Sequence, residues 1–521
     1  MPIDPVHYAR RWKTLAVLTL SLLIIGLDNT ILNVALPSLQ EEFGASASTL
    51  QWIVDAYLLV FAGFLLTAGT LGDRFGRKLA LQTGLALFGG GSLAVLAVGS
   101  ADQLIAVRAV MGLGGALIMP ATLSIISNVF PREERAKAIG IWAGMASIGI
   151  GLGPLAGGLL LEYFDWTSVF MLNVPVAALA LVLGVWFVPR SRDPEPGAFD
   201  LPGAGLSAAA LLALVYPIIE APQRGWTDPL LLACFGLAAV LGLAFVRWEL
   251  HCPEPMLNLS YLRNPRFSVA SMSISVASFA LFGASFATTQ FLQDAKGYSA
   301  LEAGLAMTPL ALGLVLGAVS GTRLTIRAGT TRVVVAGLAG LGGLLAATLG
   351  WSADMPYLPL GLWFFALALA MGWVMAPATD SVMGSVPEEK AGVGSAMNDV
   401  TRQVAGALGT AVVGSLVSSL YAARVAGSVA GLPVAAQTAA EDSIGKANAV
   451  AATLPASEGA QLTHAAADAF TSALGLGFTA AAVCALLGAV AARRWLPATH
   501  AERTAAAAGG AISREPEVQP A

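Results

Sequence analysis

Long apolar segments separated by short polar ones fill most of the chain. A bilayer core about 30 Å thick requires roughly 20 apolar residues per helix. The pattern therefore predicts an all-α polytopic membrane protein with fourteen transmembrane helices. The predicted spans are 14–37, 50–70, 79–99, 103–128, 137–161, 167–188, 203–221, 229–248, 268–292, 301–322, 332–350, 356–380, 396–421 and 468–491.

The start of the chain, HYARRWK followed by apolar residues, resembles a secretory signal. The apolar run from Thr14 to Pro37 is longer than the apolar region of a signal and lacks a convincing cleavage site. We therefore expect it to be retained as the first span.

The overall composition also points to a membrane protein. Charged residues make up 12% of the chain, whereas soluble domains carry about 25%. The three cysteines show neither disulfide nor metal-ligand spacing, and the four histidines fall outside the predicted spans, so we expect no metal site. No Gly-x-x-x-x-Gly-Lys-Ser/Thr loop is present, so ATP is not expected to supply energy. We expect no other cofactor, no enzymatic activity and no nucleic-acid partner.

The placement of Lys and Arg predicts the orientation, because cytoplasmic loops carry an excess of both. With the N-terminus in the cytoplasm, most of the 28 basic residues fall on that side. Both termini are then cytoplasmic, and the segment 422–467 is external. Two alternatives remain for this segment: a loosely ordered loop, or one containing a short amphipathic helix near 457–470. The Ala/Gly-rich tail, 496–521, is predicted to be a disordered cytoplasmic tail.

Two loops suggest an internal repeat. The loop GTLGDRFGRK (69–78) follows the second predicted span, and the loop at 320–332 after the tenth keeps its glycines and arginines but loses the aspartate. We therefore predict two six-helix halves, 1–190 and 261–495, with two inserted spans in 191–260. Such repeats are typical of transporters, whose substrate site lies between the halves near mid-membrane.

Four motifs carry a resemblance to a known family. GTLGDRFGRKLAL, LIAVRAVMGLGGA and GIWAGMASIGIGLGPLAGG resemble the loop, span-4 and span-5 antiporter signatures of the major facilitator superfamily. The second has Met111 where a glutamine is common. LDNTILNVALP in the first span is similar to the signature of the fourteen-span drug:proton antiporters, the EmrB/QacA-like branch.

The resemblance implies the major facilitator fold and a transporter driven by a proton gradient. It implies export of small lipophilic, cationic drugs or toxic compounds across the cytoplasmic (inner) membrane. We expect a monomer whose partners are these substrates, protons and the lipid bilayer. It also assigns the arginine of the span-4 motif, Arg108, to proton coupling.

Asp28 interrupts the hydrocarbon of the first span, about 13 Å from its outer end at 1.5 Å per residue. An ionisable group in a bilayer is costly and is by default a functional hypothesis. We expect Asp28 to couple protons and to contact substrate, with Asn29 and Asn33 beside it on a polar face. The alternative is an acid that only packs two helices through hydrogen bonds.

Arg108 and Asp55 lie near the outer ends of the fourth and second spans, so both are predicted to couple protons with Asp28. A structural ion pair is the alternative for Arg108, and a water-facing position is the alternative for Asp55. Phe282, Phe286 and Gln290 in the ninth span are predicted to bind substrate, because lipophilic cations favour aromatic faces. The alternative is that the phenylalanines face lipid or core.

A second group of residues is expected to govern alternation rather than recognition. The charges and glycine turns after the second span suit a cytoplasmic latch, and Gly153–Pro154 suits a bend. Small residues at Gly149, Gly153 and Gly157 recur every four positions, which lets another helix approach closely. The predicted gating residues are Gly72, Asp73, Arg74, Gly76, Arg77, Gly153 and Pro154.

Three functions remain open from the sequence. The first is a proton-coupled exporter of lipophilic, cationic compounds. The second is an exporter of an endogenous metabolite or lipid precursor on the same fold. The third is a polytopic membrane enzyme or channel, which the repeat, the antiporter motif and the lack of clustered catalytic residues disfavour.

Overall fold

The protein is helical throughout the part of the chain that its structure describes. Within that part no strand occurs, and fourteen helices are long and apolar enough to cross a membrane. The predicted all-α fold and the number of spans are therefore confirmed. The predicted tail lies, apart from Leu496, outside the described residues. This computed structural model describes residues 5–192, 200–253, 255–257, 259–386 and 391–496.

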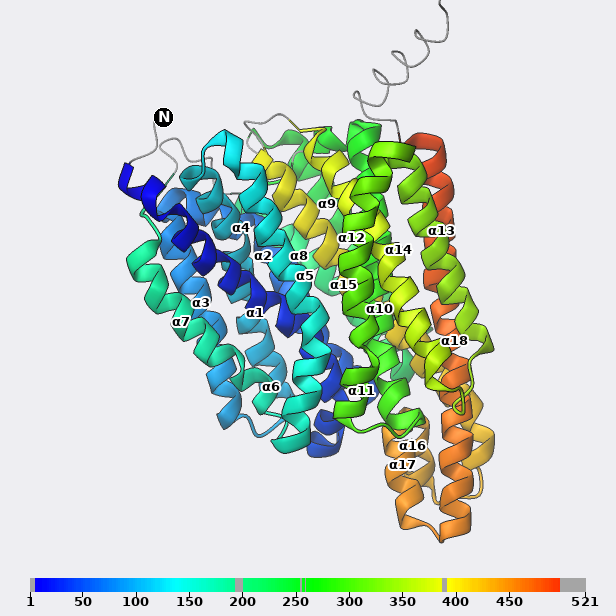
Figure 1. Ribbon diagram of the computed structural model, residues 1–521. Coiled ribbons are helices and arrows are strands. Elements are labelled where there is room, and N and C mark those ends of the chain that lie inside the picture. The colour runs from blue at the N-terminus through cyan, green and yellow to red at the C-terminus, as the bar shows by residue number, and fades with distance from the viewer. Residues whose placement is uncertain (1–4, 193–199, 254, 258, 387–390, 497–521) are drawn as a thin grey trace, which may run out of the picture.

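The helices form two bundles with two further helices beside them (Figure 1). The first bundle holds α1 (Pro5–Phe43), α2 (Ala47–Phe75), α3 (Arg77–Ala94), α4 (Ala101–Val129), α5 (Arg132–Tyr163), α6 (Ser168–Met171) and α7 (Asn173–Phe187). The additional pair is α8 (Leu201–Arg224) and α9 (Pro229–His251). The second bundle holds α10 (Pro265–Gln290), α11 (Ala300–Ala306), α12 (Thr308–Ala328), α13 (Thr330–Ala347), α14 (Tyr357–Met383), α15 (Ala391–Val429), α16 (Val434–Asp442), α17 (Ile444–Thr453) and α18 (Ala456–Trp495).

The two bundles repeat the same packing pattern. In the first, α1 packs on α5, and α4 packs on α2 and α3. In the second, α10 packs on α15, and α14 packs on α12 and α13. Gly76 joins α2 to α3 and Gly329 joins α12 to α13, and both have positive φ angles, +119° and +89°. Glycine tolerates such angles without steric cost, so the two loops share a backbone requirement as well as a sequence pattern.

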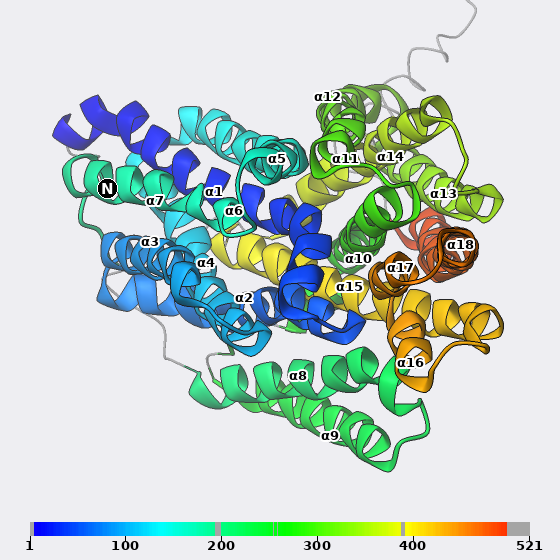
Figure 2. The same ribbon diagram turned by 90° about the horizontal axis from the view of Figure 1, so that it is seen from below.

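The inserted pair covers one flank of the molecule (Figure 2). Helix α8 packs on α2 of the first bundle and on α15 of the second, whereas α9 packs mainly on α8. The outward side chains of α9 are correspondingly exposed, as Leu243 is at 72%. The inserted pair therefore bridges the two halves on this side only.

The segment 422–467 is almost entirely helical, so the loosely ordered alternative is wrong. Helices α16 and α17 project from the bundle at the end opposite the start of α1, and α15 and α18 extend toward them (Figure 1). The segment is rich in alanine, the strongest helix former. Buried Ile444 and Ala447 pack into the second bundle's core, and the Tyr421 hydroxyl donates to the Ala440 carbonyl at 3.0 Å.

Two predicted spans are interrupted by proline. The span predicted at 301–322 is divided at Met307, because Pro309 has no N–H to donate to the Leu305 carbonyl. The span predicted at 167–188 is divided at Leu172, just before Pro175. The second break places Asn173 at the start of α7 in the interior of the bundle.

The close approach that the glycine spacing predicts occurs between α5 and α1. A Cβ on Gly149 would lie 2.8 Å from the Leu23 carbonyl oxygen, and one on Gly153 would collide with Thr30 Oγ1. Pro154 leaves the Ile150 carbonyl without its helical donor, and the Thr30 hydroxyl donates to that oxygen at 3.0 Å. A side chain of α1 thus provides the donor that Pro154 removes from α5, and the bend at Gly153–Pro154 stays a prediction.

We predict that Gly153→Ala destabilises the protein by about 1–3 kcal/mol, because overpacking forces α1 and α5 apart. Gly144→Ala is the matched control, since a Cβ there meets no heavy atom of the described residues within 4 Å. Thermal unfolding in detergent measures both variants. Equal stability of the two would contradict this packing.

Candidate functional site

Two of the three residues predicted to couple protons, Asp28 and Arg108, form a buried ion pair. Arg108 Nη1 on α4 donates to Asp28 Oδ2 on α1 at 2.5 Å, and each residue is 1% exposed. Removing one partner of such a pair leaves an uncompensated buried charge, at a cost of about 3–5 kcal/mol. The ion pair therefore holds α1 and α4 together, because separating the two charges would leave each of them buried without a counter-ion.

Arg108 also has two neutral partners on α2. Its Nε donates to the Ile53 carbonyl at 3.2 Å, and its guanidinium carbon lies 4.4 Å from the centre of the Tyr57 ring. A carbonyl and an aromatic face both stabilise a cation without being ionised. The guanidinium thus retains stabilising contacts when its carboxylate partner is neutral.

Asp28 has a neutral partner as well, which sequence reasoning missed. Asn173 Nδ2 on α7 donates to Asp28 Oδ1 at 3.3 Å and lies 3.4 Å from Ser92 Oγ on α3. Asn173 is 1% exposed and Ser92 is fully buried. A polar residue within an apolar predicted span is the same signal that identified Asp28. Tyr57 left no comparable signal, because an aromatic residue is ordinary in a membrane helix.

Asp55 is not joined to this ion pair. It is fully buried on α2, and neither of its carboxyl oxygens has a hydrogen-bond partner among the described residues. Gln51, one turn earlier on the same helix, faces α15: its Oε1 accepts from Ser415 at 3.3 Å. Asp55 therefore lies on the side of α2 that meets the second half. Asn33 is buried, Asn29 is half-buried, and the Oδ1 atom of each lacks a partner within the described chain.

The predicted aromatic residues lie in the packing between α10 and α15. A Cβ on Gly406 would be 3.0 Å from the Phe282 ring, and one on Gly414 would be 3.0 Å from the Phe286 ring. Phe286 is 4% exposed and belongs to the core of the first half. The Gln290 amide donates to the Phe286 carbonyl at 3.3 Å. In this conformation Phe286 and Gln290 are buried and Phe282 is half-buried against the core, and the substrate role of all three stays a prediction.

The latch residues form a compact turn between α2 and α3. Arg77 Nε pairs with Asp73 Oδ1 at 2.7 Å, and the Arg77 amide donates to the Ser191 carbonyl, beyond α7, at 2.9 Å. Gly72 accepts from the Gly76 amide at 2.9 Å. Arg74 is exposed. The turn therefore connects α2, α3 and the segment after α7.

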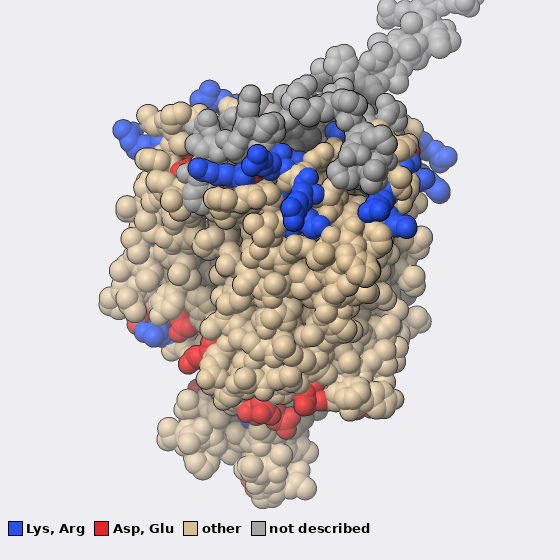
Figure 3. All heavy atoms as spheres, turned by 90° about the vertical axis from the view of Figure 1, so that its left-hand side faces the viewer, with Lys and Arg blue, Asp and Glu red and all other residues tan. Residues whose placement is uncertain are grey.

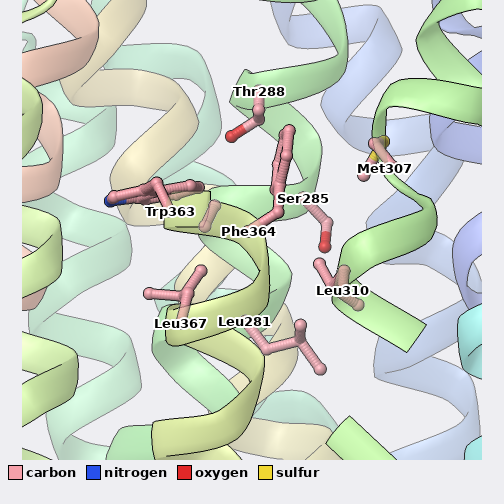
Figure 4. Close-up of a pocket in the computed structure, with 9 residues that line it drawn as sticks. Leu281, Ser285, Thr288, Met307, Leu310, Trp363, Phe364 and Leu367 are labelled. Atoms are coloured by element: carbon pink, nitrogen blue, oxygen red, sulfur yellow. The ribbon is translucent and has the colours of Figure 1, made fainter. Parts of the chain in front are cut away.

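A cavity lies in the second half, between α10, α12 and α14 (Figure 4). Its volume is about 10 Å³, room for about one water molecule and far below the roughly 300–1,000 Å³ of ligand sites. The packing pattern makes α10 and α14 the counterparts of α1 and α4. Ser285, Thr288 and Trp363 line this space, whereas the first half has its ion pair between the corresponding helices.

Charge separates the two ends of the molecule. Lys and Arg side chains form a belt at the end where α1 begins, whereas acidic side chains gather toward the end with α16 and α17 (Figure 3). We call these the basic end and the opposite end. The end of α2 with Arg74, the start of α5 with Lys137 and the end of α12 with Arg323 and Arg327 lie at the basic end.

The sequence and the fold match known transporters. The family model described as Major Facilitator Superfamily matches residues 18–410. The chain is 36% identical to "Multidrug efflux pump LfrA" of Mycolicibacterium smegmatis, covering 92% of this chain and 95% of that protein. It is 35% identical to the "Tetracenomycin C resistance and export protein" of Streptomyces glaucescens, with coverage of 93% and 91%. It is 33% identical to "Methyl viologen resistance protein SmvA" of Salmonella typhimurium, with coverage of 95% and 99%.

A solved structure agrees at the level of the fold. The inward-facing, unoccupied structure of a bacterial homologue of the human lysosomal transporter Spinster aligns with a TM-score of 0.63 at 18% identity, covering 95% of this chain and 98% of that one. The family model covers well over half of the chain, and fourteen helices can span a membrane. The protein is therefore a multi-pass membrane transporter that belongs to the major facilitator superfamily, in its fourteen-span drug-efflux branch.

Proposed function

We propose that this protein exports lipophilic, cationic compounds across the cytoplasmic membrane in exchange for protons. The single observation that supports this most is the buried Asp28–Arg108 pair, in which each charge also has a neutral partner of its own. With these neutral partners, the Asp28 carboxyl group can be either ionised or protonated while Arg108 keeps stabilising contacts. Additional hydrogen bonds also stabilise a structural buried ion pair, so proton exchange at Asp28 is what distinguishes the two roles.

The exchange follows from these contacts. When Asp28 is ionised, Arg108 and Asn173 both donate to it. When a proton neutralises Asp28, the ion pair weakens and Arg108 keeps the Ile53 carbonyl and the Tyr57 ring. The bond that ties α1 to α4 therefore depends on a proton, and α1 also packs against α5 and the second half. Protonation can thus alter the contacts between the halves.

The expected substrates follow from charge and from the relatives. Asp55 is a second carboxyl group, buried and without a partner among the described residues, on the side of α2 that faces the second half. A buried carboxylate without a counter-ion favours a cation or a proton. The relatives are named for multidrug efflux, for tetracenomycin C resistance and export, and for methyl viologen resistance. These names support drug export by this chain.

The proposal places the basic end in the cytoplasm, since basic residues concentrate on that side of membrane proteins. The Asp73–Arg77 turn then lies on the cytoplasmic side, where it acts as a latch during alternation. A monomer suffices, because both halves belong to one chain.

We predict that Asp28→Asn abolishes proton-driven efflux of cations, because the amide cannot exchange a proton. Inverted vesicles with an imposed pH gradient test this with a panel of cations, neutral drugs, metabolites and lipids. As a control, the Asp28→Asn variant should still let a neutral substrate equilibrate passively across the vesicle membrane. If wild-type vesicles move a metabolite or lipid precursor and no cation, the endogenous-exporter alternative replaces this proposal.

We predict that Asn173→Leu slows efflux about tenfold or more, because a hydrogen bond to a charged group contributes about 1.5–3 kcal/mol. Ser92→Ala is the matched control, since Ser92 contacts Asn173 rather than Asp28. Because Asp28→Asn alone abolishes efflux, the double variant is measured by thermal unfolding in detergent: Asn173→Leu should cost less stability in an Asp28→Asn background than in the wild type, because residues of one network are not additive. A full additional loss in the double variant would show that Asn173 acts apart from Asp28.

The orientation is tested with single cysteines at two sites of similar exposure. Val434, at the opposite end, is 77% exposed and Ile326, at the basic end, is 82% exposed. In intact cells, a membrane-impermeant thiol reagent should label Val434→Cys and spare Ile326→Cys, after Cys234, Cys252 and Cys484 are replaced by serine. The reverse labelling would invert the topology.

A further inference from the structure

The outer side of the first bundle carries a groove between α3 and α7, which the proposed exchange cycle does not use. Its volume is about 420 Å³, within the roughly 300–1,000 Å³ of ligand sites. The residues that line it are Gln82, Thr83, Ala86, Leu181, Val182 and Val185. Both helices lie at the left-hand edge of Figure 1, which is the side that Figure 3 shows.

Contacts between the two helices close the groove at both ends. Toward the opposite end, a Cβ on Gly89 would lie 2.9 Å from the Ala177 Cβ, so α3 and α7 touch there. At the basic end, Lys78 Nζ donates to the Val185 carbonyl at 2.7 Å. That carbonyl has no helical donor, because Pro189 follows four residues later and has no N–H.

The length of the groove matches one leaflet of a bilayer. Lys78 and Gly89 mark its two ends and are separated by about 16 Å of helix, at 1.5 Å per residue. The hydrocarbon core of a bilayer is about 30 Å thick, so one leaflet supplies about half of that depth. The groove therefore has room for a lipid chain that enters from the basic end.

The side chains that α3 presents to the groove become less polar with depth. Lys78, Gln82 and Ala86 recur every four residues, so they lie on one face of the helix. The side chains of α7 that line the groove are all apolar. The groove thus passes from a cation through an amide to hydrocarbon, in the order in which a phospholipid passes from phosphate through ester groups to acyl chains.

The amide of this series has no partner in the protein. The Gln82 Nε2 atom is buried and has no hydrogen-bond partner among the described residues. A buried donor without an acceptor is costly, so most such groups in native proteins are paired. Gln82 follows Lys78 by one helical turn, about 6 Å, so an ester carbonyl below a phosphate at Lys78 would supply the acceptor.

Two cations lie at the basic end of the groove. Arg190, just beyond α7, is a charged neighbour of Lys78, and neither forms an ion pair with a described residue. Lys78 has three N–H donors and uses one on the Val185 carbonyl. Uncompensated cations between membrane helices at the cytoplasmic side favour an anionic lipid headgroup, and they repel the amine of a zwitterionic one.

We infer that the α3/α7 groove binds an anionic phospholipid, with its phosphate at Lys78 and Arg190, its ester groups at Gln82 and one acyl chain between the helices. The inference concerns a bound lipid rather than the exported compound, so it goes beyond the proposed function and does not depend on it. The lipid joins the start of α3 to the segment after α7, which the Arg77 amide already joins through the Ser191 carbonyl.

The headgroup contacts are tested by native mass spectrometry of the purified, delipidated full chain with added dioleoyl phosphatidylglycerol. Lys78→Gln with Arg190→Gln should weaken binding about tenfold or more, since each cation near an anionic lipid contributes about fivefold. Arg323→Gln with Arg327→Gln is the matched control, because it removes the same charge from the basic end of α12. Dioleoyl phosphatidylcholine, which is zwitterionic, should bind the wild type more weakly than phosphatidylglycerol.

The place of the acyl chain is tested without a change of charge. Ala86→Trp should weaken binding of phosphatidylglycerol about tenfold, because the indole and the chain compete for the same space. Leu243→Trp on α9, at a position that is 72% exposed, is the matched control and should leave binding unchanged. Glycerol 3-phosphate at the lipid concentration should not displace the lipid, because it has the phosphate without the chains.

Four results would overturn the inference. They are equal binding of the two phospholipids by the wild type, equal weakening in the Lys78/Arg190 and Arg323/Arg327 variants, unchanged binding in Ala86→Trp, and displacement by glycerol 3-phosphate. If Lys78→Gln prevents folding, Arg190→Gln alone decides, because that side chain is exposed and its loss should still weaken binding about fivefold. None of these results bears on proton-driven efflux, which the vesicle assay measures separately.

Discussion

A charge in hydrocarbon must be compensated, and this constraint shapes the first half of the molecule. Asp28 and Arg108 lie on different helices, are almost completely buried and pair at 2.5 Å. The Ile53 carbonyl, the Tyr57 ring and the Asn173 amide surround them. Four helices therefore converge on one ion pair. A change in the charge of Asp28 alters the contact between α1 and α4 directly.

In the proposed exchange cycle, movement of α1 relative to α5 and the second half depends on backbone contacts. Glycines let α1 and α5 pack without side chains between them, and Thr30 satisfies the carbonyl that Pro154 frees. The halves are joined by polar contacts at the opposite end, where Gln40 donates to Ser443 at 2.5 Å and Gln293 donates to the Val34 carbonyl at 2.9 Å. Helices α5 and α12 lie close together near α11 and apart at the end where α1 begins (Figure 1).

Sequence reasoning predicted the spans and the repeat and singled out Asp28 and Arg108, which the structure shows buried and paired, because each leaves a local signal in the chain. It did not predict the partners. A membrane helix that is apolar all round carries no amphipathic stripe, so its sequence does not tell which face meets which neighbour. Asn173, Tyr57 and the burial of Phe286 therefore required the tertiary structure. The helices at 434–453 were also missed, because an Ala-rich polar segment suits a loop and a helix equally well.

Proton release on substrate binding tests most directly whether the buried ion pair couples transport to protons. Purified, detergent-solubilised protein in weakly buffered solution is mixed with a cationic substrate while the pH is recorded. If Asp28 holds the exchanged proton, the wild type releases protons and Asp28→Asn releases none, although it still binds the substrate. Release of equal size from both proteins would contradict this and would make Asp55 the next candidate.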